Sequence, residues 1–263
     1  MNILRKIVCL TCLLFVASCG GSGGGEGEAV GDDGGAIGAF SKVLSTCGRE
    51  GGPLTILNLG DSITESKRGY NSYRRSLWHS LAAAGCVVDF VGTRRGVSEG
   101  VRHTPGITPR NPDFDLDHEG RWGMRIDEIL PSIPSLISSI YPDIVLIHLG
   151  TNDIFQGQSI QGTAEELGIL IDSIRAYRPD VAIVISKVIP SSRSRSRLQA
   201  LNDSIDGIVF PRISGFSALL VVDQSQGYFV SDNFDGTHPG DSGEVKLADK
   251  FANAVLQLSA NSI

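Results

Sequence analysis

Short apolar runs alternate with amphipathic segments from residue 54 to the C-terminus of the chain. Five apolar runs of strand length lie at Leu54–Gly60, Cys86–Thr93, Asp143–Gly150, Val181–Ile189 and Ser217–Gln224. Five segments with helical spacing of apolar residues lie at Asn71–Gly85, Arg125–Ile140, Thr163–Asp180, Arg197–Phe210 and Asp241–Ala260. This alternation predicts a doubly wound α/β domain with a five-stranded parallel sheet. The functional residues of such a fold lie at the carboxyl ends of its strands.

Turn and cap residues set the expected limits of the helices. Gly85 fits the C-terminal cap of the first helix. The second segment is expected as one helix, or as two half-helices broken at Pro131 and Pro134. Thr163 and Glu166 form a capping box that predicts a helix start. Because residues 94–119 lack periodicity, we expect a long loop there, of the kind that is usually functional or mobile.

The N-terminal 18 residues have the layout of a secretory signal peptide, with Arg5 and Lys6 ahead of an apolar run too short to span a membrane. Val16–Cys19 resembles a bacterial lipobox, in which cleavage precedes the cysteine and a lipid is attached to it. An ordinary signal peptide is the alternative. Residues 19–35 are rich in glycine and acidic residues and predict a flexible tether to a domain at residues 36–263. We therefore expect an exported, membrane-anchored bacterial lipoprotein that carries its lipid on Cys19.

Two cysteines, Cys47 and Cys86, lie within the expected domain. Export would permit a disulfide between them. Two buried free thiols are the alternative, because a sequence does not show whether two cysteines come within bridging distance.

The formal net charge of −6 argues against nucleic acid as a partner, because phosphate binding needs a concentrated basic surface. Ser191–Arg197 is a basic cluster, and a solvated loop or a helix start explains it better than a binding patch. The sequence does not indicate an oligomeric state.

Ser62 lies two residues beyond the end of the first expected strand, at the carboxyl edge of the sheet. A serine in this place is often a helix N-cap, and Ser62 alone favours that interpretation. Asp235 and His238, in the segment DGTHP before the last helix, change the balance, because a base oriented by a carboxylate activates a serine hydroxyl. Asp61 is expected to hold the turn rather than join this triad.

An acyl-transfer site also needs hydrogen-bond donors for the oxyanion that develops in the transition state. Asn152 follows the third strand, where its side-chain amide can face the same cleft. Gly123 precedes the second helical segment, and a backbone N–H without a side chain beside it can approach a substrate oxygen closely. Taken singly, Asn152 is equally well explained as an ordinary loop residue. Gly123 is the weakest of these signals, because the chain contains 32 glycines.

Four segments in chain order, GDSIT, GRWG, GTND and DGTHP, resemble the four sequence blocks of the SGNH or GDSL hydrolases. The four residues that give the family its name match Ser62, Gly123, Asn152 and His238. The resemblance extends from about Leu54 to the C-terminal helix. It implies a flavodoxin-like, three-layer αβα fold with strand order 2-1-3-4-5.

The same resemblance implies a role for each matching residue. Ser62 attacks the ester, His238 acts as the base and Asp235 orients the imidazole. The backbone N–H groups of Ser62 and Gly123 and the side-chain amide of Asn152 bind the oxyanion. This chemistry needs neither a metal nor an organic cofactor.

Within that superfamily, the segments VVDFVGT and FDLDHEGRWGMRIDEI are similar to carbohydrate esterase family 3, whose members include acetylxylan esterases. Those members usually carry tryptophan just after the glycine that matches Gly123. In this chain Met124 follows the glycine and Trp122 precedes it. The resemblance implies an acetylated carbohydrate as the substrate.

Alternating acidic residues also invite comparison with a calcium-binding EF-hand loop; they are Asp113, Asp115, Asp117 and Glu119. The pattern fails because His118 occupies the place of the turn glycine and Met124 that of the bidentate glutamate. A polar loop beside the active site is the better interpretation, and no metal is expected. His118 and His148 are expected to be structural, since His148 lies within an apolar strand.

The sequence thus favours a serine esterase that removes small acyl groups, above all acetyl, from a carbohydrate such as acetylated xylan. A lipase-like or thioesterase-like enzyme for longer acyl chains is the alternative within the same chemistry. A non-catalytic glycan-binding module with the same fold is the alternative from another class, and the intact Ser62, His238 and Asp235 argue against it.

Overall fold

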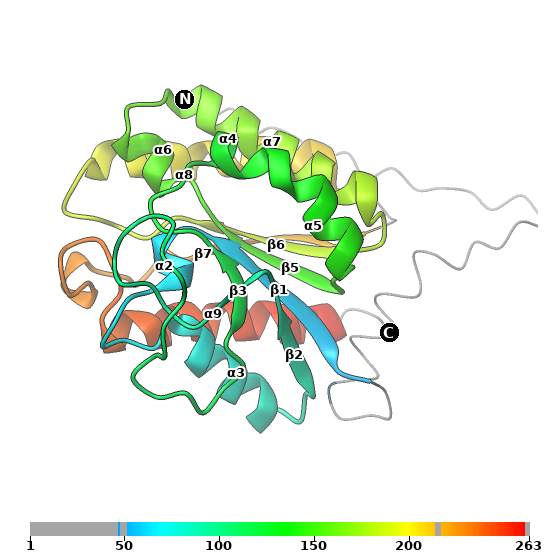
Figure 1. Cartoon of the computed structure of the whole chain (residues 1–263). Coiled ribbons are helices and arrows are strands. Elements are labelled where there is room, and N and C mark those ends of the chain that lie inside the picture. Colours follow the sequence, from blue (N-terminus) through cyan, green and yellow to red (C-terminus); the bar gives the residue numbers. More distant parts are fainter. Residues whose placement is uncertain (1–46, 48–51, 214–216, 261–263) are drawn as a thin grey trace, which may run out of the picture. The chain divides into compact units, whose positions relative to one another are not determined.

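The computed structural model describes Cys47 and residues 52–213 and 217–260 (Figure 1). For residues 259 and 260 it describes the backbone alone. All of them belong to the second of two units into which the chain divides, residues 33–263. The predicted signal peptide, the tether and Cys19 lie outside the described residues, so these predictions are not tested. Among the described residues, no helix is both long enough and apolar enough to cross a membrane.

A mostly parallel sheet forms the middle of this unit. Its strands are β1 (Leu54–Gly60), β2 (Val88–Val91), β3 (Arg94–Arg95), β4 (Asp117–Gly120), β5 (Ile144–His148), β6 (Ala182–Lys187) and β7 (Leu219–Asp223). The five strands expected from the sequence pair in the order β2-β1-β5-β6-β7, all parallel. The α/β architecture predicted from the strand-helix alternation is therefore confirmed.

The number of strands predicted from the sequence is wrong, because β3 and β4 lie in the segment expected to be a loop. β4 pairs with the carboxyl end of β1, whereas β2 pairs with its first residues. β4 has the sequence DHEG and pairs over only two residues with each neighbour, so it shows no apolar alternation. Gly92 permits its close approach, since a Cβ there would lie 2.0 Å from the carbonyl oxygen of His118.

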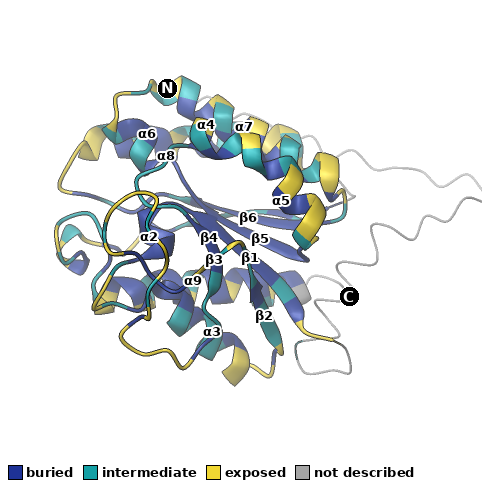
Figure 2. Ribbon diagram, in the orientation of Figure 1, coloured by how far each residue is buried: buried dark blue, intermediate teal, exposed yellow. Residues whose placement is uncertain are grey.

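Helices cover both faces of the sheet (Figure 1). One face packs against α4 (Ile126–Ile129), α5 (Ile133–Ile140), α7 (Ile160–Tyr177) and α8 (Arg195–Val209). The opposite face packs against α3 (Tyr73–Ala83) and α9 (Asp241–Ala260). The inner strands are apolar on both sides, and successive residues of β5 enter alternate cores, as buried parallel strands do (Figure 2).

The helix limits follow the predicted signals in part. Gly85 ends α3 with φ +85°, and the N–H of Cys86 donates to the carbonyl of Leu81 over 3.0 Å, as in a Schellman cap. The segment with the two prolines forms two helices, α4 and α5, with the short helix η1 (Leu130–Ser132) between them. Pro131 lies in η1 and Pro134 in the first turn of α5. The predicted capping box at Thr163 is wrong: α7 begins earlier, where the hydroxyl of Ser159 accepts the N–H of Gly162 at 3.0 Å. A serine is as good a cap as a threonine, and sequence alone did not rank the two.

A disulfide joins Cys47 to Cys86, the residue that follows the cap of α3. Of the two alternatives left open by the sequence, the structure therefore contains the bridge. It ties the chain before β1 to the segment that leads into β2.

Candidate active site

Ser62 follows β1 at the carboxyl edge of the sheet and is the first residue of the short helix α2 (Ser62–Glu65). Asp61, not Ser62, is the N-cap, because its carboxylate accepts the N–H of Ile63 at 2.9 Å. The hydroxyl of Ser62 is therefore free of the capping role that the sequence alone favoured. Gly60 is required beside it, since a Cβ there would lie 2.0 Å from the hydroxyl oxygen of Thr64.

The Asp235 to His238 loop brings a base and a carboxylate to Ser62. The Nε2 atom of His238 lies 3.0 Å from the Ser62 hydroxyl oxygen, and its Nδ1 atom lies 2.8 Å from Asp235 Oδ2. Burial opposes the charge on Asp235, but the N–H and the ring of His238 hold the pKa of Asp235 below its usual range. An ionised carboxylate only accepts hydrogen bonds, so Nδ1 carries the proton and Nε2 can accept that of Ser62. The structure thus brings these three predicted residues together.

Two side chains that sequence reasoning missed support this loop. The hydroxyl of Ser191 donates to the carbonyl of Gly236 at 3.0 Å and lies 2.9 Å from the hydroxyl of Thr237. The amide of Asn233 donates to the carbonyl of Pro190 at 3.0 Å. Ser191 begins the basic cluster that was predicted to be a solvated loop or a helix start. The cluster does lead into α8, but Ser191 itself is buried.

The two further oxyanion candidates follow the two strands that flank the carboxyl end of β1, Gly123 after β4 and Asn152 after β5. Asn152 lies on α6 (Thr151–Phe155), and its amide donates to Asp61 Oδ2 and to the carbonyl of Met124, both at 3.2 Å. Gly123 has φ +72°, a conformation that favours glycine. Among the described residues, neither the N–H of Gly123 nor that of Ser62 has a hydrogen-bond partner. Both groups are therefore available to a substrate oxygen.

A row of aromatic rings lies along the Asp235 to His238 loop, and sequence reasoning did not predict it. The ring of Trp122 stacks on that of His238, with 4.6 Å between centroids and 21° between planes. The ring of Phe234 lies near-parallel to that of His238 at 5.8 Å and stacks on Tyr70 at 4.1 Å. In the sequence, Trp122 stands out only as the residue before Gly123. The backbone N–H of Trp122 donates to Glu65 Oε2 at 2.6 Å, which attaches this residue to α2.

Burial of Asp61 has an electrostatic consequence behind the serine. Because the carboxylate is fully buried and lies near Asp153, the pKa of Asp61 is raised to about 7. Its predicted role in the turn is confirmed by the N-cap. Its second role, the hydrogen bond to Asn152, could not be read from local sequence because the two residues lie 91 positions apart.

The other histidines of interest are buried and uncharged. Burial lowers the pKa of His118 well below its usual value and that of His148 to about 4. The Nδ1 atom of His118 accepts the N–H of Gly120 at 2.9 Å, which stabilises β4. Neither ring nitrogen of His148 has a partner among the described residues. Both side chains therefore have structural positions, as expected.

The alternating acidic residues do not converge on one point. Asp113 pairs with Arg75 and Asp117 with Arg95. Asp115 accepts the N–H of Phe90 at 3.0 Å, and Glu119 accepts the hydroxyl of Thr93 at 2.7 Å. Each carboxylate thus stabilises a different part of the loop.

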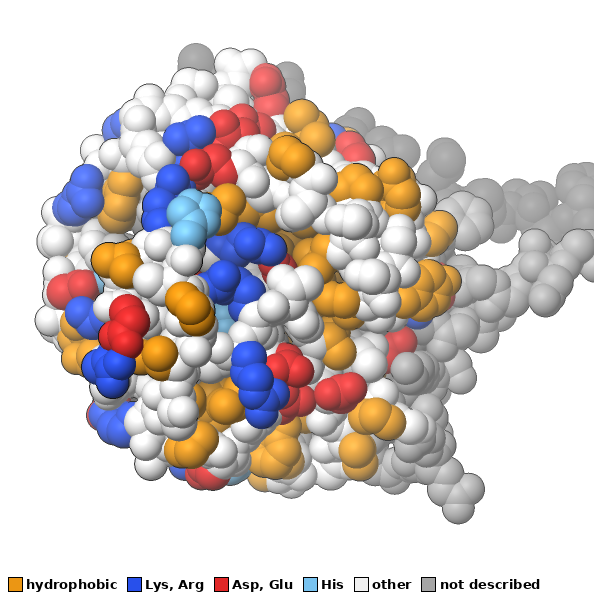
Figure 3. Space-filling model, viewed as in Figure 1, with side chains coloured by type: hydrophobic (Ala, Val, Ile, Leu, Met, Phe, Trp, Pro, Cys, Tyr) orange, Lys and Arg blue, Asp and Glu red, His pale blue; other side chains and the backbone are white. Residues whose placement is uncertain are grey.

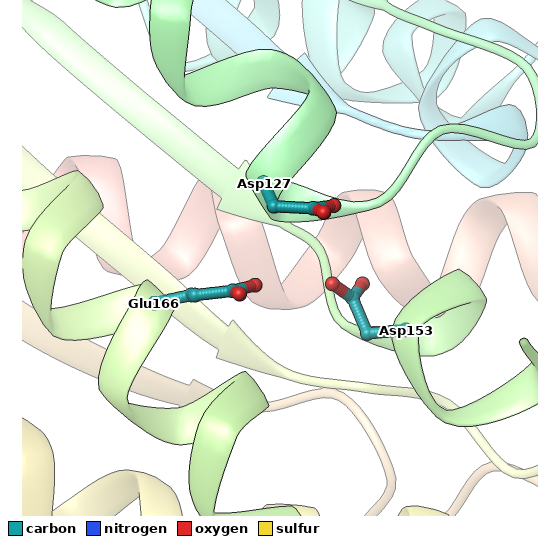
Figure 4. A group of neighbouring side chains, drawn as sticks. All are labelled: Asp127, Asp153 and Glu166. Atoms are coloured by element: carbon teal, nitrogen blue, oxygen red, sulfur yellow. The ribbon is translucent and has the colours of Figure 1, made fainter. Parts of the chain in front are cut away.

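Three other carboxylates do face one another, namely Asp127, Asp153 and Glu166, with one oxygen of each within 4.8 Å of the others (Figure 4). They could hold a cation, since Asp153 Oδ2 and Glu166 Oε2 are buried without a partner among the described residues. The other oxygen of each, and the carboxylate of Asp127, have protein partners. Arg125 pairs with Asp127 at 2.8 Å, the N–H of Ile126 donates to Asp153 at 3.0 Å and Gln158 donates to Glu166 at 2.5 Å. Burial raises the pKa of Asp153 to about 6, so a proton can also relieve the repulsion. The bond between Ile126 and Asp153 joins α4 to α6.

The chain is similar to several known hydrolases. The model of the GDSL-like lipase/acylhydrolase family matches residues 59–245. A multidomain esterase of Ruminococcus flavefaciens is 26% identical over 223 residues, which are 74% of this chain, and the chain spans only 28% of that relative. A family 3 carbohydrate esterase from Talaromyces cellulolyticus superposes with a TM-score of 0.68 at 28% identity, covering 79% of this chain and 99% of that one.

A second solved structure is similar to this chain to the same degree. The family 3 carbohydrate esterase of Clostridium thermocellum has a TM-score of 0.68 at 27% identity, and the match covers 81% of this chain and 100% of that one. The resemblance to SGNH or GDSL hydrolases, and to carbohydrate esterase family 3 among them, is thereby confirmed.

Proposed function

Because the chain belongs to the GDSL-like lipase/acylhydrolase family and is therefore a carboxylic ester hydrolase, we propose that it removes acetyl groups from a carbohydrate through a Ser62, His238 and Asp235 triad. The observation that carries this proposal is the aligned chain of contacts from Asp235 through His238 to the Ser62 hydroxyl, 2.8 Å and 3.0 Å long. These contacts match the geometry in which a serine is activated as a nucleophile.

In the first half of the reaction, His238 takes the proton of Ser62 as the serine oxygen attacks the ester carbonyl. The carbonyl oxygen gains negative charge, which the free N–H groups of Ser62 and Gly123 stabilise. The amide of Asn152 joins them by exchanging its hydrogen bond to the carbonyl of Met124 for one to the substrate oxygen. When the carbon-oxygen bond to the sugar breaks, His238 gives its proton to the departing sugar oxygen. The acyl group remains on Ser62 as an ester.

In the second half, His238 takes a proton from water as the water oxygen attacks the acyl carbon. The proton then returns to the Ser62 oxygen and acetic acid is released. Asp235 stays ionised throughout and stabilises the imidazolium, consistent with its lowered pKa.

The surroundings of the triad support a sugar rather than a long acyl chain. The cavity beside Phe234, of about 620 Å³, is lined by Arg110, Asp241 and Ser242 as well as by Tyr70. Polar groups of this kind suit sugar hydroxyls, whereas an acyl chain needs an apolar channel. Figure 3 shows Lys and Arg side chains interspersed with Asp and Glu side chains, which fits an uncharged glycan better than a polyanion.

Two measurements test this proposal. A fluorophosphonate probe should label the wild type and not Ser62→Ala, whereas an unlabelled wild type would favour the non-catalytic glycan-binding module. Aryl acetate should be cleaved with a much higher kcat/KM than aryl octanoate. The opposite preference would support the lipase-like or thioesterase-like alternative.

The location of the enzyme is a separate proposal that rests on residues 1–35 alone. A lipid on Cys19 would attach the domain to a membrane through the glycine-rich tether. Metabolic labelling with a radioactive fatty acid should mark the wild type and not Cys19→Ser. Labelling of neither protein would indicate an ordinary signal peptide.

A further inference from the structure

Two cavities lie on either side of the short helix η3 (Val230–Asp232), which precedes the catalytic loop. The first, of about 490 Å³, lies between the end of β6, the start of α8 and the segment after β7. The second, of about 620 Å³, lies between Tyr70, Arg110 and the start of α9. Both volumes are in the range of ligand sites. Ser231 lines both cavities, so both reach this residue of η3.

The second cavity lies beside the triad, and no triad residue lines it. Phe234 lines it, and the ring of Phe234 lies near-parallel to that of His238 with 5.8 Å between centroids. The first cavity lies farther along the same edge, since it follows the carboxyl ends of β6 and β7, whereas Ser62 follows that of β1. Both cavities therefore lie outside the space around Ser62 that an acetyl group needs.

Each cavity has an aromatic ring and polar neighbours. In the second, Tyr70 stacks on Phe234, and Arg110 pairs with Asp241 at 2.7 Å. In the first, the ring of Phe229 is 64% exposed, and Lys246 Nζ lies 5.1 Å from the ring centroid. A sugar ring has a face of C–H groups that packs on an aromatic ring and hydroxyls that bond to polar side chains.

We propose that the two cavities are successive subsites for one glycan chain. The chain crosses η3 at Ser231, and it rests on the Tyr70 ring in the second subsite and on the Phe229 ring in the first. This inference rests on the proposed function, because it takes the glycan to be the leaving group of the ester. The enzyme then discriminates among esters by the length of the chain that carries them.

Phe229→Ala tests this inference with a matched control in the same chain. Phe210 is 68% exposed, lies on η2 (Phe210–Arg212) and lines neither cavity, so Phe210→Ala removes an equally exposed ring elsewhere. The assay compares kcat/KM on acetylated xylo-oligosaccharides of two and of six sugars. Wild type and Phe210→Ala should prefer the longer substrate, and Phe229→Ala should lower that preference about three- to tenfold, the effect of one lost ring contact.

Binding supplies a second readout that does not depend on turnover. Retardation of Ser62→Ala on gels that contain acetylated xylan should be lost when Phe229→Ala is added and kept when Phe210→Ala is added. Equal effects of the two phenylalanine substitutions, or a wild type with no preference for length, would overturn the inference. A loss of octanoate hydrolysis confined to Phe229→Ala would also overturn it, because an acyl chain would then occupy the cavities.

The outcomes separate this inference from the proposed function. Cleavage of aryl acetate without retardation by xylan would leave the esterase intact and remove the glycan subsites. Retardation that depends on Phe229, in a protein that cleaves no ester and binds no fluorophosphonate, would support the subsites and refute the catalytic proposal.

Discussion

Replacement of Asp61 by Asn should make the protein more stable at alkaline pH and less active. Asp61 is fully buried and its pKa in the fold is raised to about 7, chiefly by burial. Asn has nearly the same shape and carries no charge. It can still accept the N–H of Ile63, but its NH₂ group would face the amide of Asn152, so two donors would oppose each other.

The sign of the stability effect follows from proton binding. An unfolded aspartate has a pKa near 3.8, so between pH 4 and 7 the folded state holds the proton more tightly than the unfolded state does. Stability from this group is therefore fully present below pH 4, falls as the pH rises to about 7 and is constant above that. The difference between the two pKa values corresponds to about 4 kcal/mol.

Urea unfolding at several pH values measures this effect. The free energy of unfolding of Asp61→Asn, minus that of the wild type, should rise by about 4 kcal/mol at most between pH 4 and pH 8. Over the same range, kcat on aryl acetate should be about 10- to 100-fold lower in the variant, because a displaced oxyanion donor costs part of the 10²- to 10³-fold effect of a deleted one. A difference in stability that does not change with pH would refute a raised pKa, and an unchanged kcat would refute the positioning of Asn152.

Three further substitutions and two treatments, with a reductant and with EDTA, give separate tests. Asp235→Asn should lower kcat by about 10³- to 10⁴-fold with little change in KM, since the imidazole loses its orienting acceptor; stopped-flow assays check this, and a loss under tenfold would contradict the role. Cys86→Ser should lower the free energy of unfolding by up to about 4 kcal/mol, because the bridge closes a separation of 39 residues. A reductant should lower the Tm of the wild type by as much as the substitution does. Ser191→Ala should reduce kcat and leave the Tm nearly constant, because it removes the hydrogen bond to the carbonyl of Gly236 in the catalytic loop. A fall in Tm without a fall in kcat would indicate a merely structural contact. EDTA should leave kcat/KM unchanged, because the proposed reaction uses only side chains and water.

The main elements of the fold could be predicted because they depend on local pattern. β5 and β6 are nearly continuous apolar runs, and buried parallel strands must be apolar on both faces. β4 could not be predicted in this way, because its four residues DHEG are stabilised by pairing with β1 rather than by burial of an apolar face. Its pairing depends on contacts that are remote in sequence, and such contacts leave no periodicity.

The site divides in the same way. Ser62, Asp235 and His238 could be predicted because a serine nucleophile requires a base and a carboxylate, and all three lie at loops on one edge of the predicted sheet. Trp122 and Ser191 could not, since a stacked ring and a buried hydroxyl are compatible with many side-chain types. Their positions depend on tertiary packing alone.

Buried carboxylates near the site indicate that its geometry is maintained at a cost in stability. Burial raises the pKa of Asp61 and of Glu244 to about 7 and that of Asp153 to about 6, so each is ionised at neutral pH only against a desolvation penalty. Each also fixes backbone beside the site: Asp61 caps α2, Asp153 accepts the first N–H of α4, and Glu244 accepts the N–H groups before α3. Apolar residues of similar volume would remove the penalty and also these hydrogen bonds. The two apolar cores on either side of the sheet offset this cost, which is why a polar edge can be held in place for catalysis.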